Sequence, residues 1–183
     1  MTSDKFKFDP SVLAPESLKD YAGGGAEAEA ASDLPRRFVY PGQIFVTREA
    51  MAISTILGSC AAVCLWDARS RAGGMNHYLL PDGPEGPNRL RYGNIANPSL
   101  LEELLALGCQ PKDLEAKIFG GASAFSSDPT VTVGMKNIEL AERFLQEAGI
   151  RVVAKDVSGR RGRRLTFHTN DGSCLLKSYE AGT

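Results

Sequence analysis

The sequence predicts one α+β domain, a layered, strand-rich α/β fold with two main helices. Three observations support this prediction. Short runs rich in β-branched and aromatic residues recur between turn residues over residues 38–179. Two segments, near 97–108 and 137–149, combine apolar residues at helical spacing with residues that begin and end helices. The 183 residues are 43% hydrophobic and 23% charged, a globular composition that can form a full core.

Residues 1–35 differ in composition from the rest of the chain. They contain prolines at positions 10, 15 and 35, three consecutive glycines at 23–25 and the tract AEAEAAS. Such a composition buries too little apolar surface to form a stable core. We therefore expect a disordered or weakly ordered extension over 1–35 and a folded domain over 36–183.

The first part of the domain is expected to consist of strands. FVYPGQIFVT (38–47) is rich in β-branched and aromatic residues and is interrupted by a Pro-Gly turn. Further strands are expected at 51–58, 61–67 and 74–81, and Pro81 ends the last of them. The following residues, DGPEGPN (82–88), are typical of a loop.

Each of the two expected helices has residues suited to its start and its end. Asn97 is expected to cap the first helix, with Pro98 in its first position and Gly108 just beyond its end. Asn137 is expected to cap the second helix, which Gly149 closes. Further strands are expected at 116–121, 130–134, 150–158, 164–169 and 173–179, with a hairpin turn at Asp171-Gly172.

Composition excludes several classes of protein. The chain has 21 Lys and Arg against 22 Asp and Glu, a net charge of −1, which disfavours a nucleic-acid binder. Its apolar runs are shorter than the roughly 20 residues of a membrane helix, and its charged N-terminus lacks a secretory signal. We therefore expect a cytoplasmic protein without membrane insertion, whose cysteines (Cys60, Cys64, Cys109 and Cys174) are reduced.

Cys60 and His77 form a candidate nucleophile and base. Cys60 follows Gly58 and Ser59 at a turn, where backbone N–H groups can stabilise a thiolate and then an oxyanion. His77 lies on the next expected strand. A hairpin whose loop is 67–70 would place His77 directly opposite Cys60, and a longer loop would shift this pairing.

Other groups are expected to complete this site. Ser54 and Thr55 both offer a hydroxyl that could orient the imidazole, and strand alternation lets only one of them face it. The N–H groups of the turn that contains Gly58, with the Ser59 hydroxyl, are expected to hold the oxyanion. Asn76, beside His77, is assigned to the same substrate cleft.

Alternative interpretations of these residues are weaker. The spacing of Cys60, Cys64 and His77 matches three zinc ligands, but no His or Cys follows at 81–83, so we expect no metal. On a strand Cys60 and Cys64 would lie roughly 13 Å apart, too far for a disulfide. The four arginines at 160, 161, 163 and 164 could form a docking surface or a solvated loop.

The segment ILGSCAAVCLWDARSRAGGMNHYLLP (56–81) closely resembles the chemoreceptor glutamine deamidases of bacterial chemotaxis, the CheD family. Its specific part is the pair GSC and GGMNH. Similar segments lie at 91–96, 117–122, 133–145 and 155–177, so the resemblance extends over about 36–178.

This resemblance implies a function and a site. Family members hydrolyse glutamine side chains on methyl-accepting chemotaxis proteins to glutamate, through a Cys–His–Thr triad on a layered α/β fold without metal or organic cofactor. Cys60 and His77 match the first two residues of the triad. The family's hydroxyl lies six residues before the cysteine, at Ser54 here, and Thr55 is the substitute candidate. The implied partners are the cytoplasmic region of chemoreceptors and a CheC-type phosphatase, and a catalytically silent adaptor is the alternative function.

Overall fold

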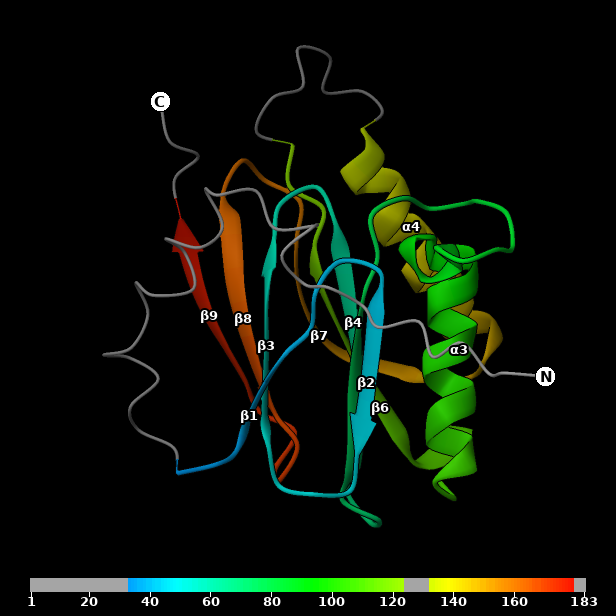
Figure 1. Cartoon of the computed structure of the whole chain (residues 1–183), viewed down its shortest axis with the longest axis vertical. Coiled ribbons are helices and arrows are strands. Elements are labelled where there is room, and N and C mark those ends of the chain that lie inside the picture. The colour runs from blue at the N-terminus through cyan, green and yellow to red at the C-terminus, as the bar shows by residue number, and fades with distance from the viewer. Residues whose placement is uncertain (1–32, 124–131, 180–183) are drawn as a thin grey trace, which may run out of the picture. The chain divides into compact units, whose positions relative to one another are not determined.

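Two β-sheets face each other, and two helices cover the outer side of the larger sheet (Figure 1). The computed structural model describes residues 33–123 and 132–179. The extension predicted over 1–35 lies almost entirely outside the described residues. The folded unit begins at Leu34.

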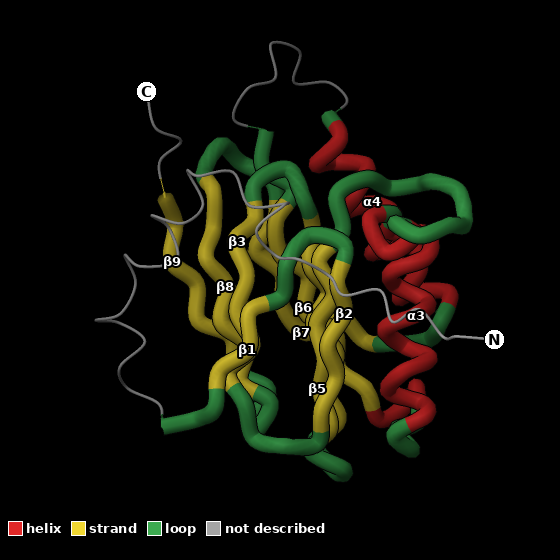
Figure 2. The backbone as a smooth tube through the Cα atoms, in the orientation of Figure 1, coloured by secondary structure: helices red, strands yellow, loops and turns green. Residues whose placement is uncertain are grey.

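The smaller sheet has four strands in the order β1-β3-β8-β9, and the larger has five in the order β2-β5-β4-β6-β7 (Figure 2). Neighbouring strands are antiparallel except for the parallel pairs β1–β3 and β6–β7. The strands are β1 (Arg36–Phe38), β2 (Gln43–Thr47), β3 (Ala52–Leu57), β4 (Ala61–Asp67), β5 (Ala72–His77), β6 (Leu114–Gly120), β7 (Arg151–Val157), β8 (Gly162–His168) and β9 (Cys174–Tyr179).

The helices are α3 (Gly93–Ala106) and α4 (Val133–Glu147), with short 3-10 turns η2 (Arg89–Arg91) and η3 (Pro111–Asp113). Both main helices begin more than one turn earlier than the sequence suggested. Tyr92 and Thr132 occupy the N-cap positions, and the Thr132 hydroxyl accepts the N–H of Met135. Asn97 and Asn137, which we expected as caps, lie inside the helices and are fully buried.

One predicted strand is wrong. Val133 and Gly134, from the strand expected at 130–134, form the first turn of α4. Residues 130 and 131 lie outside the described residues. The other predicted strands are confirmed within a few residues at each end, and so is the α+β fold class.

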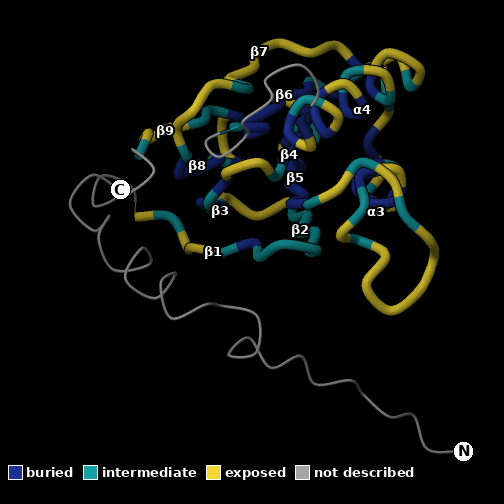
Figure 3. Tube along the Cα trace, turned by 90° about the horizontal axis from the view of Figure 1, so that it is seen from above, coloured by how far each residue is buried: buried dark blue, intermediate teal, exposed yellow. Residues whose placement is uncertain are grey.

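Two apolar cores fill the spaces between the three layers. One lies between the larger sheet and the helices, and includes Val63, Leu100, Ile118 and Leu145. The other lies between the sheets. Strands β4 and β5 contribute to both cores and are almost wholly buried, whereas edge strand β7 is exposed (Figure 3). Side chains of β4 and β5 therefore alternate between the helix side and the inter-sheet side.

Candidate active site

The β4–β5 hairpin sets the relative positions of Cys60 and His77. Trp66 pairs with Gly73 rather than with Arg71, so the register differs by two residues from the expected one. The pairing continues through a bridge between Ala61 and Tyr78, which places Leu79 opposite Cys60. The prediction that Cys60 directly faces His77 is therefore wrong. The two are diagonal neighbours on the same, inter-sheet face, a relation that spans about 7–8 Å between Cα atoms.

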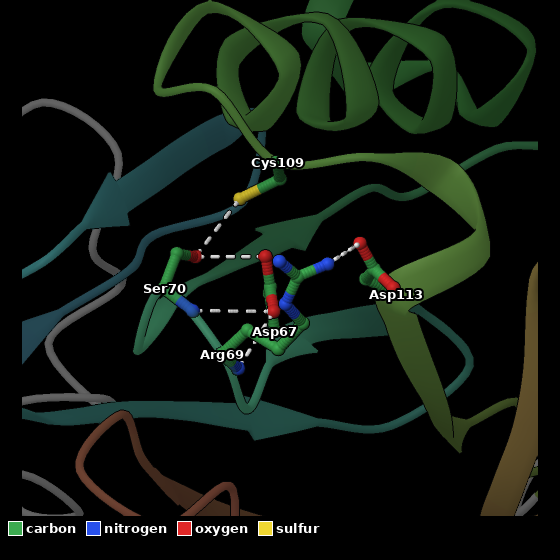
Figure 4. Close-up of polar contacts among 5 residues, drawn as sticks. All are labelled: Asp67, Arg69, Ser70, Cys109 and Asp113. Atoms are coloured by element: carbon green, nitrogen blue, oxygen red, sulfur yellow. Dashed lines mark hydrogen bonds and ion pairs between the residues drawn. The ribbon is translucent and has the colours of Figure 1, made fainter.

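The reason for this register lies at the other end of the hairpin (Figure 4). The carboxylate of Asp67 accepts the N–H of Arg69 at 2.8 Å and the hydroxyl of Ser70 at 2.8 Å. These bonds make Asp67 the start of an Asx-type turn. The turn therefore extends to Arg71, which has a φ of 55°. The Ser70 hydroxyl also lies 3.6 Å from the thiol of Cys109, which is buried in the core between the larger sheet and the helices.

Thr55 and His77 meet across the two sheets. Thr55 Oγ1 lies 2.8 Å from His77 Nδ1, and the Thr55 hydroxyl donates to the carbonyl of Val39 at 2.7 Å. A hydroxyl has one proton, and a carbonyl can only accept. Because that proton is directed to Val39, Thr55 must accept from Nδ1–H. The neutral imidazole then has its lone pair on Nε2, the form that a general base needs.

The second ring nitrogen of His77 is available for chemistry. Its Nε2 is buried and has no hydrogen-bond partner among the described residues. Burial lowers the pKa of His77 to about 4, and the nearby carbonyl of Val39 partly opposes this effect. The imidazole is therefore neutral at physiological pH, and its unpaired nitrogen can accept a proton.

The other candidate hydroxyl points away. Ile53, Thr55 and Leu57 of β3 are fully buried toward the larger sheet. Ser54, which lies between Ile53 and Thr55 in the sequence, is only half-buried. Alternation along a strand places Ser54 on the opposite face of β3. The structure thus brings Thr55, and not Ser54, to His77.

Hydrogen bonds to its backbone carbonyls hold the turn over residues 58–60, here called the nucleophile turn. The carbonyl of Gly58 accepts the N–H of Ala122, and that of Cys60 accepts the N–H of Gly121, both at 2.8 Å. Within the described part of the chain, no backbone carbonyl takes the N–H of Ser59 or Cys60. These two N–H groups are therefore candidate oxyanion donors.

Cys60 is half-buried. Burial raises its pKa, while its own backbone N–H and the positive charge of Arg91 oppose the rise. The thiol is therefore protonated at neutral pH, so the base must remove its proton during attack.

Arg91, to which the sequence assigns no role, carries a positive charge that lowers the pKa of the Cys60 thiol. It lies in η2 at the end of the Pro/Gly loop, and its carbonyl accepts the N–H groups of Leu79 and Leu80 at 2.9 and 3.1 Å. Its side chain passes next to Gly42, whose N–H donates to the carbonyl of His77 at 2.7 Å. No spacing in the sequence relates Arg91 to Cys60, because a long loop brings it back to the site.

Asn76 is a correction to the predicted cleft. Its side chain points to the helix side, opposite to that of His77 on the same strand. Its Oδ1 accepts the N–H of Val63 at 2.9 Å, and its Nδ2 donates to Asn97 Oδ1 at 2.8 Å. Asn76 is fully buried and joins the larger sheet to α3 rather than lining a cleft.

The arginine cluster is largely part of the fold. Arg163 is buried and donates to Asp156 at 2.7 Å and to the carbonyls of Ser158 and Arg161. Arg164 is buried as well, which leaves Arg160 and Arg161 exposed. Among the described residues, no group of three or more His, Cys, Asp or Glu side chains is arranged to hold a metal ion. Within that same part of the chain, no helix is long and apolar enough to cross a membrane.

A thiol at a turn, a buried imidazole on the same face of the hairpin and a hydroxyl that orients the imidazole are typical of enzymes with a cysteine nucleophile. The chain belongs to the CheD family: the family model "CheD chemotactic sensory transduction" matches residues 79–178. This confirms the resemblance seen in the sequence.

Relatives of known name are similar over most of the chain. A Sulfurimonas denitrificans protein named "Probable chemoreceptor glutamine deamidase CheD" is 44% identical over 151 residues, which cover 79% of this chain and 95% of that protein. An Anaeromyxobacter dehalogenans protein named "Probable chemoreceptor glutamine deamidase CheD 1" is 43% identical over 169 residues, covering 92% and 94%. A solved Neisseria meningitidis protein of family model DUF152 is 13% identical with a TM-score of 0.48, covering 92% of this chain and 83% of that one.

Proposed function

We propose that this protein is a protein-glutamine glutaminase that deamidates specific glutamine side chains of chemoreceptors to glutamate. Membership of the CheD family and the names of its relatives support the substrate class. The observation that carries the proposal is the Thr55–His77 contact, which leaves Nε2 unpaired on the face that Cys60 shares. The same resemblance predicts a CheC-type phosphatase partner, which stays a prediction, as does the cytoplasmic location expected from the composition.

In the first half of the reaction, Cys60 attacks the glutamine side-chain carbonyl carbon. His77 Nε2 takes the thiol proton as the C–S bond forms, which is needed because the thiol is protonated at rest. The N–H groups of Ser59 and Cys60 hold the developing oxyanion. The imidazolium then gives its proton to the amide nitrogen, the C–N bond breaks, and ammonia leaves behind a thioester.

In the second half, neutral His77 takes a proton from water, and the resulting hydroxide attacks the thioester carbonyl. The C–S bond breaks, the Cys60 sulfur regains the proton from His77, and the product is a glutamate side chain. Thr55 holds the imidazole of His77 in place throughout, because its hydroxyl accepts from Nδ1–H and is itself held by its bond to the Val39 carbonyl. Arg91 lies where its positive charge lowers the free energy of the transient thiolate.

The test is deamidation of a receptor cytoplasmic fragment, followed by peptide mass spectrometry. Replacement of the amide NH2 by OH increases the mass of a modified peptide, which locates the glutamine. Cys60→Ala should abolish the increase, and Cys174→Ala, a half-buried cysteine outside the site, should retain it. An absence of modified peptides with the wild-type protein, on every receptor from the same cell, would contradict the proposal and favour the adaptor function.

A further inference from the structure

Asn137 joins the two halves of the site through their backbone. It is fully buried in the second turn of α4, and its side-chain Nδ2 donates to the carbonyl of Ser59 at 3.0 Å and to that of Leu79 at 2.9 Å. Ser59 immediately precedes Cys60. Leu79 stands opposite Cys60 in the hairpin and lies two residues beyond His77. One amide group therefore fixes the spacing between the nucleophile turn and the strand that carries the base.

The bond to Ser59 also determines where the N–H of Cys60 points. The C=O and N–H of a trans peptide unit point in opposite directions, and the described residues contain no cis peptide. Asn137 takes the Ser59 carbonyl on the helix side of the larger sheet. The Cys60 N–H in the same peptide unit consequently points to the other side, where the Cys60 thiol lies.

The environment of Asn137 favours a positioning role over simple packing. Its Oδ1 is buried without a partner among the described residues, although buried amide oxygens are almost always paired. An unpaired buried oxygen destabilises the fold and offsets part of the stability that the two donated hydrogen bonds provide. Two donors aimed at two carbonyls of the active site give a reason for an asparagine here.

We propose that Asn137 is a positioning residue of the active site, which aims the Cys60 N–H at the oxyanion and holds Cys60 at a fixed spacing from His77. This inference rests on the proposed deamidase function. It assigns the residue no contact with substrate. It predicts that the loss of the Asn137 amide impairs the step in which charge develops on the oxyanion far more than it lowers the reactivity of the thiol.

The experiment compares two reactions of the same protein. Asn137→Ala and the equally sized Asn137→Asp both remove the amide donor. Their kcat for receptor deamidation should fall about 10- to 100-fold with little change in KM, because misplaced oxyanion donors impair only the transition state. Alkylation of Cys60 by iodoacetamide needs the thiolate, which the Cys60 N–H also favours, but it needs no oxyanion donor. Its rate should therefore fall much less than kcat. Near-UV circular dichroism of each variant gives the fraction of folded molecules, and kcat is expressed per folded molecule.

Asn97→Ala is the matched control. Asn97 is a buried asparagine on α3 in the same layer, and it bonds Asn76 rather than the nucleophile turn. Its replacement should destabilise the fold similarly and leave kcat per folded molecule unchanged. A wild-type kcat in Asn137→Ala, or a parallel fall of kcat and alkylation rate, would overturn the inference while the wild-type activity still supported the proposed function. An inactive wild-type protein would instead overturn both.

Discussion

At the level of single residues, the alternation of side chains along β3 decides which of two adjacent hydroxyls meets His77. Thr55 lies 2.8 Å from Nδ1, whereas Ser54 lies on the other face. We predict that Thr55→Ala lowers kcat about 10- to 100-fold, because the imidazole loses the acceptor that fixes its tautomer. Thr55→Ser keeps a hydroxyl and should retain most of the activity. Steady-state deamidation kinetics would measure both.

Ser54→Ala is the control for this prediction, since it removes a hydroxyl one residue away on the same strand. We expect its kcat to stay near the wild-type value. A larger loss of kcat in Ser54→Ala than in Thr55→Ala would show that Ser54, at the family's usual spacing from Cys60, is the third member of the triad.

Residue types made part of this site predictable. A cysteine at a Gly-Ser turn and a histidine on the next strand were identified from the sequence, because few other chemistries need that pair. The pairing of Cys60 and His77 could not be predicted, because the hydrogen bonds of the Asp67 carboxylate set the register of the β4–β5 hairpin. Arg91 and Asn137 reach the site through tertiary contacts that leave no periodic signal in the sequence.

At the level of elements, the helix starts show how a local rule can be overridden. Asparagine is favoured at N-caps, and Asn97 and Asn137 each precede a helical pattern. Their side chains instead bond groups of the larger sheet and its loops, which a cap position would not allow. The segment TVTVG has strand-like residues, yet Thr132 caps α4 within it. Tertiary bonds outweighed local propensity at both positions.

The end of β6 supports the nucleophile turn and requires glycine. Gly120 has a φ of 108°, and a Cβ placed on it would collide with the carbonyl of Cys60. Gly149 also has a positive φ, of 67°, but a Cβ there would meet nothing within 4 Å. These two positions thus share backbone strain, and only Gly120 adds a clash.

We predict different effects for alanine at these two glycines. Gly149→Ala should lower the free energy of unfolding by about 1 kcal/mol, because the only cost is an alanine in the left-handed backbone conformation. Gly120→Ala should lower it by about 2–4 kcal/mol, and should also lower kcat, because the Cys60 carbonyl must move. Urea unfolding and deamidation kinetics would measure these quantities. Equal effects of the two substitutions would mean that the turn moves freely and that β6 does not hold it.

At the level of the whole molecule, the site exists only when all three layers are assembled. Thr55 comes from the smaller sheet, Cys60 and His77 from the larger sheet, and Asn137 from the helix layer. The layered fold class could be predicted from strand and helix patterns. The way in which the layers meet could not, since it depends on side chains far apart in sequence. Stability and activity should therefore be coupled through His77, which lies between the two sheets.

This coupling predicts how the stability of the protein changes with pH. Folding lowers the pKa of His77 from its usual 6.5 to about 4, so the unfolded state binds the proton more tightly. His77 therefore does not destabilise the fold above pH 6.5, and as the pH falls from 6.5 toward 4 its protonation increasingly favours unfolding. At pH 5 the resulting loss in the free energy of unfolding is about 2 kcal/mol.

The measurement compares urea unfolding of wild type and His77→Gln at pH 7 and pH 5. The acidic groups with lowered pKa, such as Asp67 and Asp171, are common to both proteins, so the difference between them isolates His77. The variant should lose about 2 kcal/mol less than wild type over this range. A wild-type loss equal to that of the variant would mean that folding does not lower the pKa of His77. A wild-type loss smaller than that of the variant would mean that folding raises this pKa, as a resting Cys60 thiolate paired with an imidazolium would do. The proton transfer assigned to the attack step would then occur before substrate binds.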